Sequence, residues 1–238
     1  MRVVLTAAAH ERWWPRLERP GVEPLILGVD GGLVLASGAG VARDEADPEV
    51  AWGTSDLFDE GAPLRPFFGL LRRSSTLRWF QSPAAGYDGA VFGELARRGV
   101  RVSNAHVNGI PIAEYVLRAV LDHFQDAGRW RAGAEARGWR LHDFREVYGT
   151  TWLVVGLGSI GGAVATRARA FGARVIGCRR RPSADDPADE TVTPERLLDV
   201  VGAADVVVLS APSTAATVGL VDAAFLRAMK PGSLLVNV

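Results

Sequence analysis

The stretch Gly156-Leu157-Gly158-Ser159-Ile160-Gly161 decides the fold of the second half of the chain. It follows an apolar run over 152–156 that is typical of a buried strand, and it opens a helical pattern over 159–171. In such a turn the first glycine permits the tight bend, the second lets a pyrophosphate approach the backbone, and the third lets the helix pack on the strand. The phosphates then meet free N–H groups at the start of the helix. The sequence therefore predicts a dinucleotide-binding turn, with a purely structural glycine turn as the alternative, and its contacts are expected from Gly156, Gly158, Ser159, Ile160 and Gly161.

The segments after this turn continue the alternation of strands and helices. Strands are predicted over 174–178, 206–211 and 233–238, helices over 193–201 and 222–229, and a polar loop over 179–191. This order predicts an α/β fold with a Rossmann doubly wound parallel sheet.

The first hundred residues also alternate. Short apolar runs predict strands at 2–6, 24–28, 49–52, 77–81 and 100–103, and helical patterns cover 64–73 and 87–98. Parallel strands need crossover connections, so a second, largely parallel α/β layer is expected here. A single long helix over 112–130, entered after Pro111, links the two halves. We therefore expect two domains, 1–104 and 105–238.

The residues after the second strand of the Rossmann pattern distinguish between nicotinamide cofactors. An acidic side chain at this position binds the ribose 2′-hydroxyl of NAD, but the chain has Arg179, Arg180 and Arg181. Guanidinium groups suit a 2′-phosphate. The sequence favours NADP, with NAD possible; the alternative is a solvated basic loop.

Composition excludes several classes of partner. Lys plus Arg and Asp plus Glu both number 27, so no general attraction to nucleic acid or an anionic membrane is expected. The uncharged stretch 147–166 contains five glycines that would interrupt a membrane-spanning helix, and the apolar run near the N-terminus is better explained as a strand than as a signal peptide. The single cysteine, Cys178, excludes an intrachain disulfide, and we expect a cytoplasmic protein.

Several ordered motifs carry a family resemblance. They comprise 154–165 around the glycine turn, 204–214 with Thr217, 229–237, and Asn104-Ala105-His106-Val107-Asn108-Gly109. From about Leu77 to Val238 the chain resembles the D-isomer-specific 2-hydroxyacid dehydrogenases. The arginines after the second strand resemble glyoxylate and hydroxypyruvate reductases more than NAD-linked phosphoglycerate dehydrogenases.

This resemblance implies a flavodoxin-like substrate domain over 1–104 and a Rossmann domain over 105–238, each incomplete. The loop 82–88 matches the family loop whose backbone amides hold a 2-oxo or 2-hydroxy acid carboxylate, which implies contacts from Ala84, Ala85 and Gly86. Ala84 replaces a more usual glycine. Ala211 and Pro212 would line the cofactor site with Thr217 as a polar contact, although Pro212 is equally explained as a strand terminator. The helix from Ile112 and the stretch 130–139 resemble the arm that forms the family dimer, so a homodimer is expected.

The family's reaction moves a hydride between nicotinamide and substrate, and it uses an arginine together with a histidine oriented by a glutamate. In the order in which the family's motifs follow one another along the sequence, this arginine, the glutamate and the histidine are all expected after Val238. None of the four histidines has a visible carboxylate partner, so no catalytic and no metal-binding residue is assigned. The leading hypothesis is an NAD(P)-dependent oxidoreductase. The alternative is a nicotinamide-nucleotide-binding regulatory protein of the same fold; a methyltransferase is disfavoured because the segment 229–232 and Pro212 have no role there.

Overall fold

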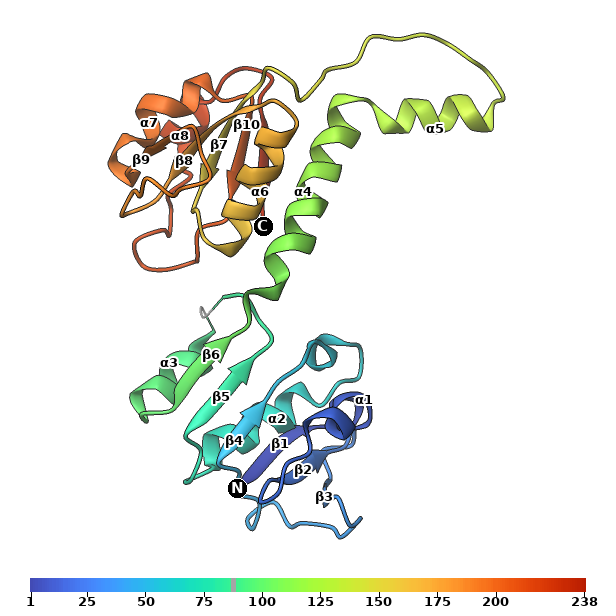
Figure 1. Cartoon of the computed structure of the whole chain (residues 1–238), viewed down its shortest axis with the longest axis vertical. Helices are drawn as coiled ribbons and strands as arrows, with labels where there is room; N and C mark the ends of the chain where they lie inside the picture. The colour runs from blue at the N-terminus through green and yellow to red at the C-terminus, as the bar shows by residue number, and fades with distance from the viewer. Residues whose placement is uncertain (87–88) are drawn as a thin grey trace. The chain divides into compact units, whose positions relative to one another are not determined.

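The computed structural model describes residues 1–86 and 89–238 (Figure 1). The chain divides into two compact units, Met1–Ala105 and His106–Val238, each built around one β-sheet. Tyr87 and Asp88, which belong to the expected substrate loop and to the start of the helix predicted over 87–98, lie outside the described residues.

The first unit contains a six-stranded sheet in the order β3-β2-β1-β4-β5-β6. All neighbouring strands are parallel except the edge strand β3, which is antiparallel to β2. If β3 is left out and the five parallel strands are numbered 1 to 5 in chain order, their order across the sheet is 2-1-3-4-5. This is the flavodoxin-like order. The flavodoxin-like fold is thus confirmed. The strands are β1 (Arg2–Thr6), β2 (Glu23–Leu27), β3 (Leu33–Leu35), β4 (Val50–Trp52), β5 (Trp79–Ser82) and β6 (Arg101–Asn104).

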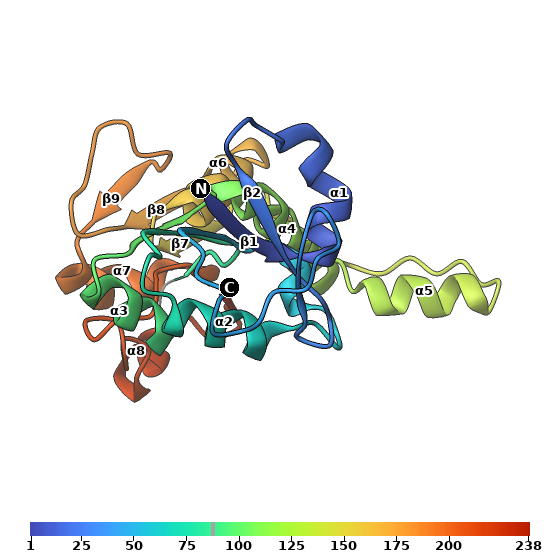
Figure 2. The same cartoon turned by 90° about the horizontal axis from the view of Figure 1, so that it is seen from below.

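Helices cover both faces of this sheet. Figure 2 shows α1 (Ala7–Leu17) on one side and α2 (Leu64–Arg73) with α3 (Ala90–Arg97) on the other; a 3-10 turn, η1 (Ser55–Phe58), follows β4. Side chains alternate along a strand, so neighbouring residues of β1 serve different cores. Val4 packs in the cluster that contains Phe67 and Phe80, whereas Leu5 packs with Trp14 of α1.

The second unit contains a five-stranded sheet in the order β11-β10-β7-β8-β9, and every pair is parallel. If these five strands are numbered 1 to 5 in chain order and read from β9 to β11, their order is 3-2-1-4-5. This is the Rossmann order, which confirms the predicted Rossmann sheet. The segment 179–191 is not entirely a polar loop, however, because β9 adds a short edge strand next to β8. The strands are β7 (Thr151–Val155), β8 (Arg174–Cys178), β9 (Glu190–Val192), β10 (Val206–Leu209) and β11 (Leu234–Asn237).

The prediction of one helix over 112–130 is wrong in its second part. Helix α4 ends at Phe124, and Asp126 takes a left-handed conformation with φ +49°. The Asp126 carboxylate then accepts a hydrogen bond from the Arg129 N–H at 3.2 Å and caps a separate helix, α5. Aspartate is one of the few side chains that tolerates this conformation and also caps helices well. The helical segments of this unit are η2 (His106–Asn108), α4 (Gly109–Phe124), α5 (Ala127–Glu135), α6 (Ser159–Ala170), η3 (Pro194–Arg196), α7 (Leu197–Val200), η4 (Val201–Ala203) and α8 (Ala223–Ala228).

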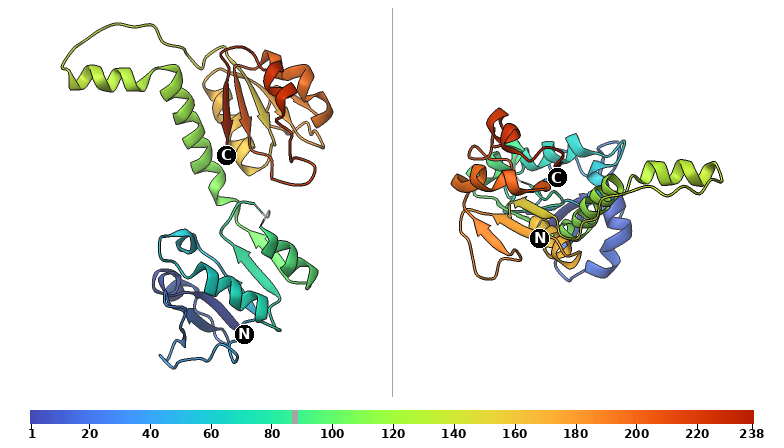
Figure 3. Two further views of the ribbon diagram at one scale, coloured as in Figure 1. Left: turned by 180° about the vertical axis from the view of Figure 1, so that it is seen from behind. Right: turned by 90° about the horizontal axis from the view of Figure 1, so that it is seen from above.

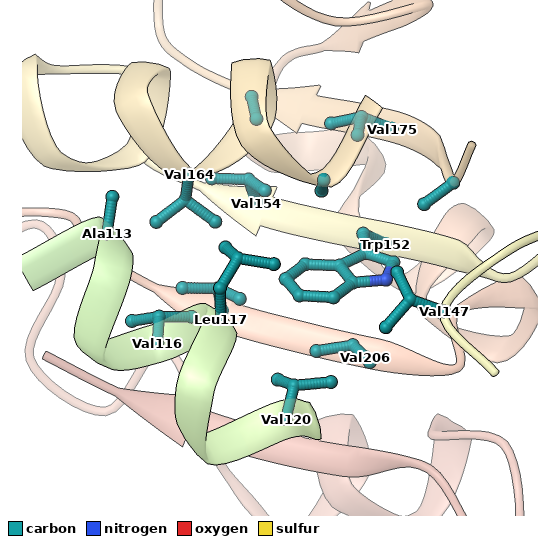
Figure 4. Close-up of a cluster of buried hydrophobic side chains, with 14 of the residues drawn as sticks. Ala113, Val116, Leu117, Val120, Val147, Trp152, Val154, Val164, Val175 and Val206 are labelled. Atoms are coloured by element: carbon teal, nitrogen blue, oxygen red, sulfur yellow. The ribbon is translucent and has the colours of Figure 1, made fainter. Parts of the chain in front are cut away.

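Two cores sandwich the second sheet. On one face α4 and α6 pack around the fully buried Trp152 (Figure 4). The Trp152 indole N–H donates to the Thr150 hydroxyl at 3.1 Å. On the other face Leu153 and Val155 pack with α7 and α8. Helix α5 buries no residue and leads away from this sheet (Figure 3). No helix in the described part of the chain has both the length and the apolar character needed to span a bilayer.

Candidate nucleotide-binding site

The candidate site lies at the carboxyl ends of β7 and β10. These strands are neighbours, and the strand order reverses between them, which is where ligands of open α/β sheets bind. Gly156 follows β7, and Ser210 follows β10. The Ser210 N–H donates to the Val155 carbonyl at 2.9 Å, and its hydroxyl donates to the Gly156 carbonyl at 2.8 Å. The glycine turn and the segment 210–212 are therefore held side by side.

Gly156 is required by the geometry of the turn. Its φ of +95° lies in the region that glycine alone occupies readily. Its N–H donates to the Cys178 carbonyl at 2.8 Å, and a Cβ at this position would lie 2.7 Å from the Ala211 nitrogen. Two strand ends thus hold the start of the turn at a position where no side chain fits.

Gly158 and Gly161 have opposite surroundings. A Cβ on Gly161 would lie 1.8 Å from the Gly156 oxygen, so this glycine lets the first turn of α6 rest on the end of β7. A Cβ on Gly158 would meet no atom within 4 Å, and the backbone there has an ordinary φ of −79°. Gly158 therefore borders open space.

That open space adjoins the start of α6. Gly158 is the N-cap residue, and no side chain of the described chain accepts a hydrogen bond from the first N–H groups of the helix, those of Ser159, Ile160 and Gly161. Such groups carry partial positive charge and bind phosphate. The residues present therefore fit a pyrophosphate, because they leave both the room and the donors that it requires.

Gly109 also contributes to the shape of this region. A Cβ on Gly109, the first residue of α4, would lie 2.6 Å from the carbonyl oxygen of Ser159. The absence of a side chain lets α4 begin directly against the start of α6. The segment 104–109, noted in the sequence as part of a motif, thus ends against the glycine turn.

The basic segment after β8 contains one anchored arginine, Arg179, followed by the exposed Arg180 and Arg181. Arg179 pairs with Asp186 at 2.5 Å, and the Asp186 side chain is 3% exposed. Burial raises the pKa of Asp186, but the Ser183 N–H and Arg179 outweigh it and hold this pKa below its usual value. Arg180 is exposed, and no ion pair or hydrogen bond of its side chain occurs among residues 1–86 and 89–238.

The segment after β10 is ordered by its own threonine. The Thr217 hydroxyl donates to the Pro212 carbonyl at 2.7 Å and accepts from the Thr214 N–H at 2.8 Å. It therefore closes the loop 212–217. Ala211 backs the glycine turn, and Pro212 is exposed immediately after it.

Cys178 lies beneath the turn as an inert thiol. It is 2% exposed, and burial, with a smaller contribution from the negative charge of Glu195, raises its pKa to about 11. A thiol with this pKa is protonated at neutral pH and is a poor nucleophile. Its backbone carbonyl, which accepts from Gly156, is the part of Cys178 that shapes the site.

At the opposite end of β10, Asp205 forms a network that sequence reasoning missed. Its carboxylate accepts from Lys230 and Arg145, each at 2.6 Å, and from the Thr151 N–H at 2.8 Å. Burial raises the pKa of Asp205, but these donors together lower it below its usual value. The network joins the starts of β7 and β10 to the turn before β11, so its role is structural.

In the first unit, the expected substrate loop follows β5. The Ala84 N–H donates to the Ser82 hydroxyl at 3.1 Å, and the Asn104 side-chain amide donates to the Ala85 carbonyl at 2.8 Å. The N–H groups of Ala85 and Gly86 have no acceptor within the described ranges. The loop thus has two available amide donors, whereas the Ala84 N–H is already engaged.

The described histidines lie against aromatic side chains or on the surface and are not part of the glycine turn. Two histidines contact tryptophans: His10 stacks on Trp14 and His142 lies 4.2 Å from the Trp130 ring centroid. No group of three or more His, Cys, Asp or Glu residues within 1–86 and 89–238 could hold a metal ion.

The sequence model of the D-isomer specific 2-hydroxyacid dehydrogenase NAD binding domain matches residues 117–238, slightly more than half of the chain. The chain therefore belongs to the D-isomer-specific 2-hydroxyacid dehydrogenase family and carries its NAD-binding domain, which confirms the resemblance read from the sequence. It is 33% identical over 172 residues to the glyoxylate reductase of Thermococcus kodakarensis, covering 68% of this chain and 52% of that one. It is 32% identical over 171 residues to the D-3-phosphoglycerate dehydrogenase of Mycobacterium leprae, covering 71% of this chain and 32% of that one. The chain thus spans about half the length of the glyoxylate reductases that it matches, and less of the phosphoglycerate dehydrogenases.

Solved structures share the fold. A family member from Xanthobacter autotrophicus Py2, in complex with NADPH and MES, has a TM-score of 0.69 at 23% identity, covering 99% of this chain and 71% of that one. The D-lactate dehydrogenase of Aquifex aeolicus, complexed with NAD and lactic acid, has a TM-score of 0.73 at 20% identity, covering 99% and 68%. Relatives of this fold thus bind either nicotinamide cofactor.

Proposed function

We propose that the protein containing this chain is an NADP(H)-linked oxidoreductase that transfers a hydride between nicotinamide and a 2-oxo or 2-hydroxy acid of the glyoxylate or hydroxypyruvate type. The observation that carries the proposal is the open space at Gly158, bordered by the free N–H groups at the start of α6. When bound, the nicotinamide supplies or accepts the hydride.

The cofactor roles follow from the surroundings of each residue. Gly156 and Gly161 shape the turn, Gly158 leaves room for the pyrophosphate, and the N–H groups of Ser159, Ile160 and Gly161 bind it. Arg180 binds the 2′-phosphate of NADP through its free guanidinium, with Arg179 as an anchored second donor. Ala211, Pro212 and Thr217 form the neighbouring wall.

The substrate role falls to the first unit. The loop after β5 offers the N–H groups of Ala85 and Gly86 to a carboxylate, and Ala84 contributes by positioning this loop through Ser82. We assign no catalytic residue within the chain. The role of 1–104 as substrate domain and of 105–238 as cofactor domain is part of the same proposal.

We further propose that the protein is a homodimer, located in the cytoplasm. Helix α5 has nine residues and buries none, although a helix of this length is unstable alone in water. The segment that follows exposes Trp139 at 82% and Leu141 at 84%. A groove of about 430 Å³ between α4 and α6 is lined by the apolar side chains of Leu117, Leu121 and Phe171 and bordered by the charged residues Glu114, Arg118, Asp122 and Arg167. A second copy would cover these apolar surfaces. The assignment to the cytoplasm is based on the single cysteine, which fits a reducing compartment.

Two measurements on the protein expressed from its complete gene test the enzymatic proposal. NADPH should bind in a fluorescence titration, and adding glyoxylate should cause NADPH oxidation. The Gly158→Asp variant should lose both, because a Cβ at this position meets no atom within 4 Å and the added carboxylate would repel the pyrophosphate. Binding of NADPH without oxidation by glyoxylate or hydroxypyruvate would contradict the assigned reaction.

A further inference from the structure

The first unit contains a hollow whose lining no part of the proposed reaction uses. It has a volume of about 290 Å³ and lies between the turn that joins β2 to β3 and one face of α2. Its floor is apolar, and its polar lining consists of three guanidinium groups without a carboxylate. The lining residues are Leu27, Gly31, Leu33, Arg43, Arg65, Pro66, Gly69, Leu70 and Arg73.

Two of these arginines have no counter-charge. Within residues 1–86 and 89–238, the side chains of Arg65 and Arg73 form no ion pair or hydrogen bond, although both lie on α2. Their neighbour Arg72, on another face of the same helix, pairs with Glu94 at 2.9 Å. Like charges that line one hollow repel each other, and a bound anion would relieve that repulsion.

Glycine leaves the space between the two free guanidinium groups open. Arg65, Gly69 and Arg73 are spaced four residues apart, so they share one face of α2. A Cβ on Gly69 would meet only the Arg73 Nη1, at an ordinary 3.5 Å, and glycine inside a helix costs about 1 kcal/mol relative to alanine. The backbone does not require glycine here, because Gly69 is absent from the positive-φ positions.

The third arginine is held in place from the opposite side. Arg43 donates to the Gly31 carbonyl at 3.2 Å, and a Cβ on Gly31 would lie 2.7 Å from the Arg43 Nη2. Asp30, in the same turn, accepts a hydrogen bond from the Gly32 N–H and does not line the hollow. Arg43 is therefore oriented by the backbone, without an acidic partner in the lining.

We propose that this hollow is a binding site for a phosphate-bearing small molecule. Three guanidinium groups lining one hollow match a tetrahedral group with several charged oxygens better than a planar carboxylate, which one arginine satisfies in bidentate fashion. The site is distinct from the loop at Ala84–Gly86, because that loop follows β5 while the hollow lies at β2, and β1 and β4 separate those strands.

The test is a calorimetric titration of inorganic pyrophosphate into the whole chain carrying Gly158→Asp, which removes the nucleotide turn as a competing phosphate site. We expect saturable binding that the double variant Arg65→Gln/Arg73→Gln weakens by roughly tenfold or more. Arg97→Gln, which changes an exposed arginine outside the hollow, should leave the affinity unchanged. Equal affinity in the double variant, or no saturation by about 10 mM pyrophosphate, would overturn the proposal.

A matched pair at one position separates charge from folding. Gly69→Glu places a carboxylate between the two free guanidinium groups and should abolish pyrophosphate binding, whereas Gly69→Ala should retain it. Both substitutions replace glycine in a helix by a better helix former, so both variants should melt no lower than the parent. Equal loss of binding in the two variants, or tighter binding of citrate than of pyrophosphate, would contradict a phosphate site.

Discussion

Arg179 lies 2.5 Å from Asp186, a carboxylate whose side chain is 3% exposed. This ion pair fixes the first arginine after β8 at the end of the strand and orders the loop that contains Arg180 and Arg181. Arg179 also serves the loop structure, since Asp186 would otherwise be a nearly buried charge without its cation. The two arginines proposed to bind the 2′-phosphate therefore differ in what their substitution should do.

NADPH should bind more tightly than NADH by about 2 kcal/mol, roughly thirtyfold, because a guanidinium binds the 2′-phosphate. Arg180→Ala should narrow this gap without changing the melting temperature, whereas Arg179→Asp should narrow it and also lower the melting temperature. Fluorescence titrations with both cofactors measure the gap, and Arg97→Ala serves as the control. Identical titration curves for NADPH and NADH in the parent protein would refute the assignment.

The second and third glycines of the turn should respond differently to alanine. Gly161→Ala should destabilise the protein by about 3 kcal/mol, because its Cβ would overlap the Gly156 oxygen. Gly158→Ala should leave the free energy of unfolding unchanged but weaken NADPH binding by about tenfold or more, because the methyl group occupies the phosphate approach. Denaturant unfolding and cofactor titration of both variants provide the check. A Gly158→Ala protein that binds NADPH normally would show that the pyrophosphate lies elsewhere.

Asp205 should contribute acid-sensitive stability. Since the pKa of Asp205 is lowered in the folded protein, the unfolded chain binds the proton more readily. The contribution of the Asp205 carboxylate to the free energy of unfolding is fully present above the ordinary carboxyl pKa, and it is lost as pH falls through the lowered pKa of the folded protein. Asp205→Asn should cost about 2 kcal/mol at pH 7, because Lys230 and Arg145 lose their anion, and should flatten the dependence of stability on pH in the acid range. The exposed Asp199, paired with Arg196, provides the control, and equal effects of Asp199→Asn and Asp205→Asn would be inconsistent with this network.

Cys178 should resist thiol reagents in the folded protein. A pKa of about 11 leaves roughly one thiol in a thousand ionised at pH 8, and burial blocks access. Modification by a chromogenic disulfide should therefore be slow at pH 8 and become fast in denaturant. Rapid modification of a chain that retains its native circular dichroism spectrum would contradict the burial of this thiol.

The proposed dimer should depend on the segment that follows α5. At micromolar concentration the protein should sediment as a dimer, and Trp139→Glu/Leu141→Glu should shift it to monomer, because these exposed side chains are proposed to lie in the apolar interface. Val29→Glu changes a residue of the first unit that is 76% exposed and should leave the assembly intact. A parent protein that sediments as a monomer would remove the proposal.

The sequence predicts the parts of the fold that carry strong local signals. Strands β7, β8 and β10 coincide with short runs rich in valine and isoleucine, and the glycine turn fits only between a strand and a helix. Strands β3 and β9 were not predicted: each has three residues, too few to show an alternating pattern, and the equally short β4 was predicted only from its apolar run. The end of α4 was also missed, since no glycine or proline marks it and the break depends on the left-handed Asp126.

The contacts within the site were less accessible to sequence reasoning. The sequence contains Asp186 and Ser210, but periodicity does not reveal that one pairs with Arg179 and the other donates to Gly156. The Ser210 contact joins two strand ends that are far apart in the sequence, whereas the Arg179 contact depends on how the loop between β8 and β9 folds back on itself. Residue type and spacing therefore located the glycine turn, while its supporting hydrogen bonds required the structure.

The support of Gly156 by Ser210 and by the Cys178 carbonyl has a kinetic consequence. Since both hydrogen bonds are made between groups of the chain itself, the turn is held in shape by its own neighbours, and we expect little conformational entropy to be lost when the pyrophosphate binds. Association at this turn should then proceed in a single phase whose rate rises linearly with cofactor concentration, without a slow isomerisation step. Differences in affinity between the two nicotinamide cofactors should accordingly be found in their dissociation rates.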